Sequence, residues 1–183
     1  MKHIVIISSS VRKERLSHRI ALFLQKQIES TGLATAEILD LKEYNFPLFD
    51  ERLMYQDNPS EKVLDFTARF VQADGVFMVS PVYNASYPAA LKNVIDLFVK
   101  EWKDKIVAVA TVTYGSNAGI TTALELQALL LKLGAMVVPP FYTALNAGTE
   151  YNEEGNPVEP EMATKFVKPV IEKLFYMINR LTV

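Results

Sequence analysis

The sequence predicts an α/β protein in which helices cover both faces of one parallel sheet. Short apolar runs alternate along the chain with longer stretches that have the spacing of amphipathic helices. The runs are apolar throughout rather than at every second residue, which is typical of parallel strands buried on both faces. Half of the 183 residues are hydrophobic, so the chain has enough apolar material for a sizeable core.

Five strands are predicted, each from a short and mostly apolar run. In chain order they are residues 4–7, 36–41, 75–79, 105–112 and 136–138. Pro139 and Pro140 follow the last run and are expected to end it, because proline cannot donate a hydrogen bond to a neighbouring strand.

Helices are predicted between and after these strands, over residues 20–32, 60–73, 88–100, 120–133 and 162–180. Ser60 is expected to cap its helix and Pro88 to open the next one, because these residues suit a helix start. Gly134 ends the fourth helix, and Pro169 is expected to kink the last. Residues 42–59 and 146–160 are polar or proline-bearing and predict long loops.

Five strands joined by helices in a chain of this length fit a flavodoxin-like three-layer sandwich, with strand order 2-1-3-4-5. In that order a ligand binds beyond the carboxyl ends of the strands, where strands one and three meet. The loops after residues 7, 79 and 112 are therefore expected to carry function. No change in composition marks a boundary, so residues 1–183 are expected to form a single domain.

The composition excludes several classes of function. Nineteen basic and 21 acidic residues leave a formal charge of −2, which argues against a nucleic-acid partner. No apolar run is long enough for a membrane span. The absence of cysteine excludes thiolate chemistry, and two histidines make a histidine-rich metal site improbable, so no metal is expected. A cysteine-free chain also fits a reducing, cytoplasmic location.

The first loop reads SSSVRKERLS over residues 8–17 and lies between a strand and a helix start. Free N–H groups at a helix start favour an anion, and Ser10, Arg12 and Ser17 add hydroxyl and guanidinium donors. The loop lacks the GKS or GKT of a nucleoside-triphosphate loop and the GxGxxG of a dinucleotide turn. The sequence therefore leaves two alternatives, a phosphate site or an ordinary polar turn.

The second and third loops offer groups suited to a planar ligand. Residues 80–88 contain Asn84 as a small polar donor and Tyr83 as an aromatic face. Residues 113–119 contain Tyr114, while Gly115 and Gly119 allow close backbone approach or positive φ. Either loop alone could be a simple connection, but all three are expected at the same sheet edge.

Three stretches of the sequence together suggest a family. The S-x-R pattern with a later serine resembles a G-S-x-R…S phosphate loop, and residues 113–140 resemble a glycine loop, helix and final strand. The most specific stretch, PVYNASYPAALKNVIDLF over residues 81–98, resembles P-E-Y-N…P-x-x-L-K-N-A-I-D. These are motifs of the NADPH-dependent FMN reductase family, and the similarity covers nearly the whole chain.

The resemblance implies an FMN-dependent oxidoreductase. Hydride would pass from NADPH or NADH to bound flavin and then to a quinone, azo compound, free flavin or similar acceptor. The implied ligands are Ser10, Arg12 and Ser17 for the phosphate, Pro81, Val82, Tyr83 and Asn84 for one side of the ring, and Tyr114, Gly115 and Ser116 for the other. The chemistry would be that of the flavin, so no catalytic side chain is expected.

Two other functions stay open. A flavodoxin-like electron carrier is disfavoured because its T-x-T-G-x-T loop is absent and such carriers are more acidic than −2. A non-catalytic flavin sensor is kept open by Ser9, where relatives often have glycine, and by Val82, where many have glutamate.

Assembly is expected to involve copies of the same chain, as a homodimer or homotetramer. Residues 44–55 contain Tyr44, Phe46, Phe49 and Tyr55, which are many aromatic side chains for one surface loop. We therefore expect this loop to contact a partner subunit and to border the acceptor pocket.

Overall fold

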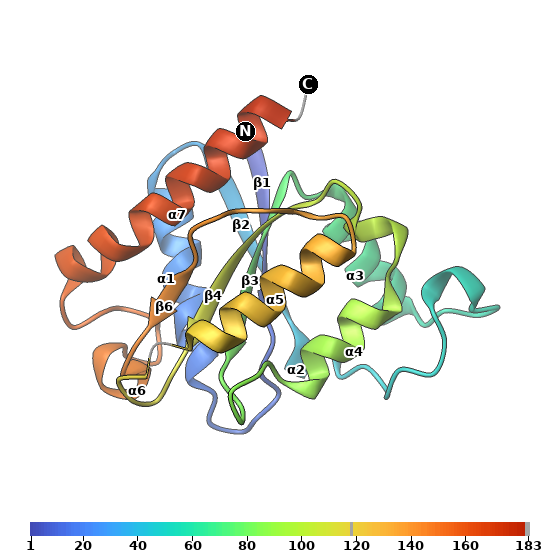
Figure 1. The fold of residues 1–183 in the computed structure, drawn as a ribbon, viewed down its shortest axis with the longest axis horizontal. Coiled ribbons are helices and arrows are strands. Elements are labelled where there is room, and N and C mark those ends of the chain that lie inside the picture. Colours follow the sequence, from blue (N-terminus) through green and yellow to red (C-terminus); the bar gives the residue numbers. More distant parts are fainter. Residues whose placement is uncertain (118, 182–183) are drawn as a thin grey trace.

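The computed structural model describes residues 1–117 and 119–181, and its centre is a parallel sheet in the order β2-β1-β3-β4-β5 (Figure 1). This confirms the predicted flavodoxin-like fold. The strands are β1 (Lys2–Ser8), β2 (Ala34–Asp40), β3 (Gly75–Pro81), β4 (Ile106–Val112), β5 (Met136–Val137) and β6 (Tyr142–Ala144).

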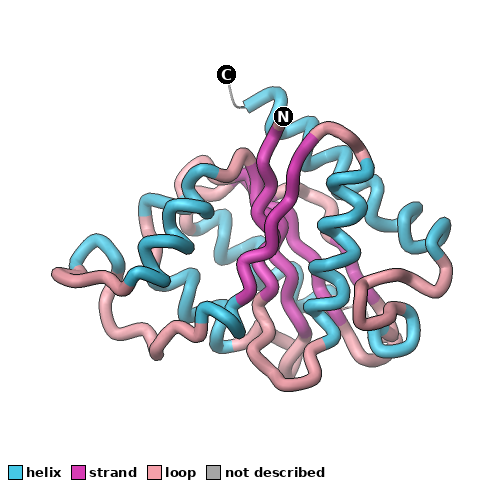
Figure 2. Tube along the Cα trace, turned by 180° about the vertical axis from the view of Figure 1, so that it is seen from behind, coloured by secondary structure: helices cyan, strands magenta, loops and turns pink. Residues whose placement is uncertain are grey.

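Helices lie on both faces of the sheet, as Figure 2 shows from behind. The longer helices are α1 (Leu16–Ser30), α3 (Glu61–Gln72), α4 (Ala89–Leu97), α5 (Ile120–Lys132) and α7 (Pro160–Leu181). Short turns complete the chain: α2 (Leu41–Tyr44), α6 (Ala147–Glu150), and the 3₁₀ turns η1 (Leu53–Tyr55) and η2 (Lys100–Trp102). No helix within the described residues is both long and apolar enough to cross a membrane.

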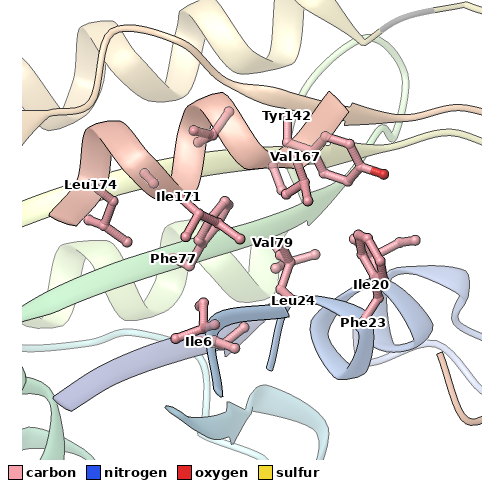
Figure 3. Packing of buried hydrophobic residues seen from close by; sticks show 14 of the residues in the cluster. Ile6, Ile20, Phe23, Leu24, Phe77, Val79, Tyr142, Val167, Ile171 and Leu174 are labelled. Carbon is pink, nitrogen blue, oxygen red and sulfur yellow. The ribbon is translucent and has the colours of Figure 1, made fainter. Parts of the chain in front are cut away.

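Two hydrophobic cores form because successive residues of a strand point to opposite faces. Ile4 and Ile6 of β1 pack with α1 and α7 in one core, part of which Figure 3 shows. Val5 and Ile7 pack with α3, α4 and α5 in the other. These four side chains are fully buried, which explains why the strand sequences are apolar throughout.

The strand register brings the predicted functional loops together. Ser8 is paired with Val79 across β1 and β3, and Pro81 is paired with Val112 across β3 and β4. The loops after β1, β3 and β4 therefore leave the sheet at one edge, at the bottom of Figure 1, whereas both chain ends lie toward the top.

The fifth strand differs from its prediction because it is divided. β5 and β6 both pair with β4 in parallel, and the prolines predicted to end the strand lie between them. The prolines interrupt the hydrogen bonding to β4, but the chain stays beside β4, so β6 pairs with the same strand as β5. β6 was not predicted, because three residues carry little periodicity.

The helix predicted over residues 88–100 is shorter than expected. α4 ends at Leu97, and the chain then turns through η2. The side chain of Trp102 is fully buried, and its indole N–H donates to the Ile95 carbonyl oxygen at 3.1 Å. Burial of this large side chain stabilises the turn in place of another helical turn. Ser60 accepts a hydrogen bond from Val63 N, so its predicted role as N-cap is confirmed.

The aromatic residues of segment 44–55 are less exposed than the sequence suggests. The rings of Tyr44 and Phe46 lie 5.1 and 5.5 Å from the ring of Phe66, which belongs to α3 and is fully buried. The side chain of Tyr55 is 62% exposed. Phe49 is also half-buried, so the expectation of four exposed aromatics was wrong for Tyr44, Phe46 and Phe49.

Candidate functional site

A cavity of about 770 Å³ opens at the carboxyl edge of the sheet, between the loops after β1, β3 and β4. Its volume lies in the range of sites for small molecules and cofactors. Seven of the ten predicted site residues line it: Ser10, Arg12, Ser17, Pro81, Val82, Tyr83 and Tyr114. The structure therefore brings together residues that are more than 100 positions apart in the chain.

The N-terminus of α1 forms one end of this cavity and is suited to an anion. Leu16 opens the helix, its first turn contains no acidic residue, and no side chain caps it. Ser17 is 1% exposed, and its hydroxyl has no hydrogen-bond partner among the described residues. A buried hydroxyl usually has a partner, so a ligand oxygen at this helix end would satisfy it. This is the observation that best fits a phosphate group.

Ser10 and Arg12 contact the second loop through Tyr83. The hydroxyls of Ser10 and Tyr83 are 2.6 Å apart, and the Arg12 guanidinium lies 5.6 Å from the centre of the Tyr83 ring. Arg12 N also donates to the Ser10 hydroxyl at 3.4 Å. Tyr83 therefore connects the predicted phosphate residues to the predicted ring-binding loop, a contact that the sequence analysis missed.

Beneath the first loop lies a group of charged residues around Asp40, at the end of β2. The Arg15 guanidinium donates to both carboxylate oxygens of Asp40, and His18 Nδ1 lies 3.6 Å from the same carboxylate. His18 Nδ1 is also 3.1 Å from the Ser8 hydroxyl. Burial and the nearby Arg15 lower the pKa of His18, although Asp40 opposes them.

The second loop is a tight hairpin turn. The backbone N–H and carbonyl groups of Tyr83 and Ser86 bond reciprocally, at 2.8 and 3.0 Å. Asn84 and Ala85 between them have φ values of 51° and 64°, as in a type I′ turn. Asn84 is exposed and does not line the cavity, so its predicted contact with a ring stays a prediction.

The third loop is held at its base and open at its tip. Thr113 N donates to the Ala144 carbonyl at 3.0 Å, and the Thr113 hydroxyl donates to the Gly115 carbonyl at 2.8 Å. Tyr114 is 85% exposed, and Gly115 and Ser116 are exposed beside it, outside the cavity lining. Ala118, within the predicted turn over 115–119, lies outside the described residues.

The two glycines of this loop differ in role. Gly119 has a φ of +57°, and a Cβ there would lie 2.8 Å from the Val82 side chain. This confirms the predicted need for a close approach and a positive φ. Gly115 has no positive φ, and a Cβ there would meet no described atom within 4 Å. Nothing among the described residues therefore requires glycine at position 115.

The sheet is parallel and doubly wound, the N-terminus of α1 is suited to an anion, and a cavity lies across the β1/β3 switch point. These features together define the flavodoxin-like class of mononucleotide-binding proteins. Residues 2–150 match the model of the family described as NADPH-dependent FMN reductase. The chain therefore belongs to the NADPH-dependent FMN reductase family. The predicted family is confirmed, and with it an FMN-dependent oxidoreductase that uses NAD(P)H.

Individual relatives agree with this assignment. An NAD(P)H-dependent FMN reductase of Saccharomyces cerevisiae is 32% identical over 157 residues, which cover 79% of this chain and 81% of the relative. A quinone reductase of Pseudomonas putida is 29% identical over 147 residues, 76% of each chain. The solved structure of FerB, a flavoenzyme NAD(P)H:(acceptor) oxidoreductase from Paracoccus denitrificans, superposes with a TM-score of 0.76 at 26% identity, covering 100% of this chain and 98% of FerB.

Proposed function

We propose that this protein transfers reducing equivalents from NAD(P)H to a quinone or a similar small acceptor through FMN held in the cavity between the three loops. The unpaired, buried hydroxyl of Ser17 at the start of α1 is the observation that carries the proposal, because it marks a place for an anionic oxygen. Azo compounds and free flavin are further candidate acceptors. The name of the Pseudomonas relative favours a quinone.

The three loops would bind different parts of FMN. Ser10, Arg12 and Ser17 would hold the phosphate, with Arg12 supplying the positive charge. Pro81, Val82, Tyr83 and Asn84 would contact one side of the ring, and Tyr114, Gly115 and Ser116 the other. Bound FMN supplies the two-electron chemistry. The side chains of the chain bind and orient, and none of them is assigned a proton transfer.

A steady-state assay tests this function. The protein is loaded with FMN, and the oxidation of NADPH and of NADH is followed with a benzoquinone, an azo dye or free FMN as acceptor. We expect turnover that depends on bound FMN and is fastest with the quinone. Binding of FMN without any oxidation of NADPH or NADH would instead support an electron carrier or a flavin sensor.

We also propose that residues 1–183 act as one domain that assembles into a homodimer or homotetramer through segment 44–55. Leu48 is 85% exposed and Tyr55 is 62% exposed, beside a hollow of about 410 Å³ that this segment shares with α4. Asn93 of α4 holds the segment by donating to the Pro47 carbonyl at 2.7 Å and accepting from Phe49 N. The NAD(P)H co-substrate and the cysteine-free sequence support a cytoplasmic location.

Sedimentation of the variant Leu48→Ser/Tyr55→Ser tests this assembly. The double variant is expected to sediment as a lighter species than the wild type. Leu33→Ser is a matched control, because Leu33 is 59% exposed in a different turn. An unchanged mass for the double variant would exclude this segment as the interface.

A further inference from the structure

Arg15 lies inside the predicted phosphate loop, yet its side chain points away from solvent and toward β2. It donates to both oxygens of the Asp40 carboxylate. The side chains of Arg15 and Asp40 are only 12% and 7% exposed, so water screens this ion pair little. A bidentate pair of this kind fixes the plane of the guanidinium as well as its position.

The same guanidinium also contacts the backbone of the loop. Nη1 of Arg15 donates to the Ser10 carbonyl oxygen at 3.0 Å. In a trans peptide unit the C=O and the following N–H point in opposite directions. By holding the Ser10 carbonyl, Arg15 therefore turns the Val11 N–H to the other side of the peptide. Among the described residues this N–H has no hydrogen-bond partner, and Ser10 and Arg12 on either side of Val11 line the cavity although Val11 itself does not.

Asp40 also neutralises the charge of Arg15 at the N-terminus of α1. Arg15 occupies the N-cap position of α1, where a free cation would be unfavourable beside the positive end of the helix dipole. Pairing with Asp40 neutralises that charge and holds the guanidinium against the Ser10 carbonyl. Asp40 is held in turn, because its Oδ1 accepts from Lys42 N at 3.0 Å at the start of α2.

We propose that the Arg15–Asp40 pair is a positioning device for phosphate recognition. Arg15, held by Asp40, fixes the Ser10–Val11 peptide and so the placement of Ser10 and Arg12, which line the cavity on either side of Val11. Asp40 does not line the cavity, and Arg15, which does, is assigned a positioning role because its guanidinium is bonded to Asp40 and to the Ser10 carbonyl. The inference rests on the proposed binding of FMN, and it assigns the phosphate-specific part of that binding to two residues beyond the predicted ligands.

The test compares FMN with riboflavin, which has the same ring and ribityl chain but no phosphate. Dissociation constants for both are measured by quenching of flavin fluorescence in the wild type, Asp40→Asn, Arg15→Gln and Arg15→Lys. Asn keeps an oxygen for Lys42 N but loses the charge. Lys keeps the charge but cannot bond two carboxylate oxygens and a carbonyl together.

We expect each variant to raise the dissociation constant for FMN about tenfold, the scale of one charge-assisted hydrogen bond, and that for riboflavin less than twofold. The double variant Arg15→Gln/Asp40→Asn should bind FMN as tightly as whichever of its two single variants binds FMN less tightly. The two losses should not add, because both residues act through one peptide. The control Arg69→Gln removes an arginine that pairs with Asp65 on the surface of α3, and should change neither constant.

Two results would overturn the inference. FMN affinity equal to the wild type in all three variants would show that the pair does not act on the phosphate. An equal loss for FMN and riboflavin would show a general structural role. If the wild type itself fails to bind FMN, the proposed function fails instead, so the two failures are distinguishable. Melting temperatures of the ligand-free variants identify any that do not fold, and Arg15→Lys then serves as the milder substitution.

Discussion

At the scale of single residues, the buried hydroxyl of Ser17 is the most informative group in the site. A buried polar atom without a partner is unfavourable for the ligand-free protein, because it has lost its hydrogen bonds to water. Such a group persists where a ligand supplies the missing partner. If FMN binds as proposed, the Ser17 hydroxyl lowers the stability of the ligand-free protein and raises the affinity for FMN.

Ser17→Ala is expected to leave the free energy of unfolding of the ligand-free protein unchanged or slightly higher. It should weaken FMN binding by about 0.5–1.5 kcal/mol, the contribution of one neutral hydrogen bond. Chemical denaturation and fluorescence titration measure the two quantities. A substitution that destabilises the free protein and leaves FMN affinity unchanged would show that the hydroxyl is structural.

Arg12→Ala is expected to weaken FMN binding by about 1.5–3 kcal/mol, because a hydrogen bond to a charged group is lost. Arg12 is exposed at the cavity rim, so the melting temperature of the ligand-free protein should change little. Isothermal titration with FMN gives the affinity. Lys13→Ala is a matched control in the same exposed turn, and equal losses in the two variants would contradict a specific role for Arg12.

His18 gives the ligand-free protein a pH dependence of stability. Burial and Arg15 lower its pKa below the usual 6.5, so the folded protein binds this proton less readily than the unfolded chain. Neutral His18 makes its full contribution to the free energy of unfolding above pH 6.5. This contribution is lost as the pH falls toward the lowered pKa. His18→Gln should therefore reduce the fall in melting temperature just below pH 6.5. An identical fall in the variant and the wild type would refute this assignment.

At the scale of elements, residues 152–157 hold the chain against α1 through one glycine. Gly155 has a φ of +75°, and a Cβ there would lie 2.5 Å from the Arg19 carbonyl oxygen and 2.7 Å from Phe23 N. Both neighbours are backbone atoms of α1, so neither can move without disturbing the helix. Arg19 of α1 also contacts this part of the chain, because its guanidinium donates to the Tyr151 carbonyl oxygen at 2.8 Å.

Gly155→Ala is expected to lower the free energy of unfolding by about 2–4 kcal/mol, because it adds a clash with α1 to an unfavourable φ. Gly32→Ala is the matched control. Gly32 has a similar φ of +67°, but a Cβ there would meet no described atom within 4 Å, so this substitution should cost about 1 kcal/mol. Thermal denaturation compares them, and equal losses would show that the contact with α1 is unimportant.

The elements also show what a single sequence can and cannot predict. The apolar runs and the caps at Ser60 and Pro88 depend on local chemistry, so the strands and most helix positions were predictable. Tyr44 and Phe46 were misjudged, because their burial depends on Phe66, which is distant in sequence and adjacent only after folding. The Arg15–Asp40 pair is 25 residues apart and was missed for the same reason.

At the scale of the whole molecule, the fold supplies a position and the cofactor supplies the chemistry. A near-neutral chain with no cysteine and two histidines has few reactive side chains of its own. Its parallel sheet brings three loops to one edge, where a helix end and a cavity of about 770 Å³ suit a phosphate-bearing planar ring. The three loops meet at one edge, as predicted, because parallel strands end at the same edge.

This cavity is proposed to hold FMN in a form that NAD(P)H can reduce. The most direct measurement is the visible absorption spectrum of the purified protein loaded with FMN and titrated with NADPH without oxygen. We expect the flavin bands to bleach with one equivalent of NADPH and to return when a quinone is added. A protein that binds no FMN, or one whose bound flavin keeps its bands in excess NADPH and NADH, would contradict the claim.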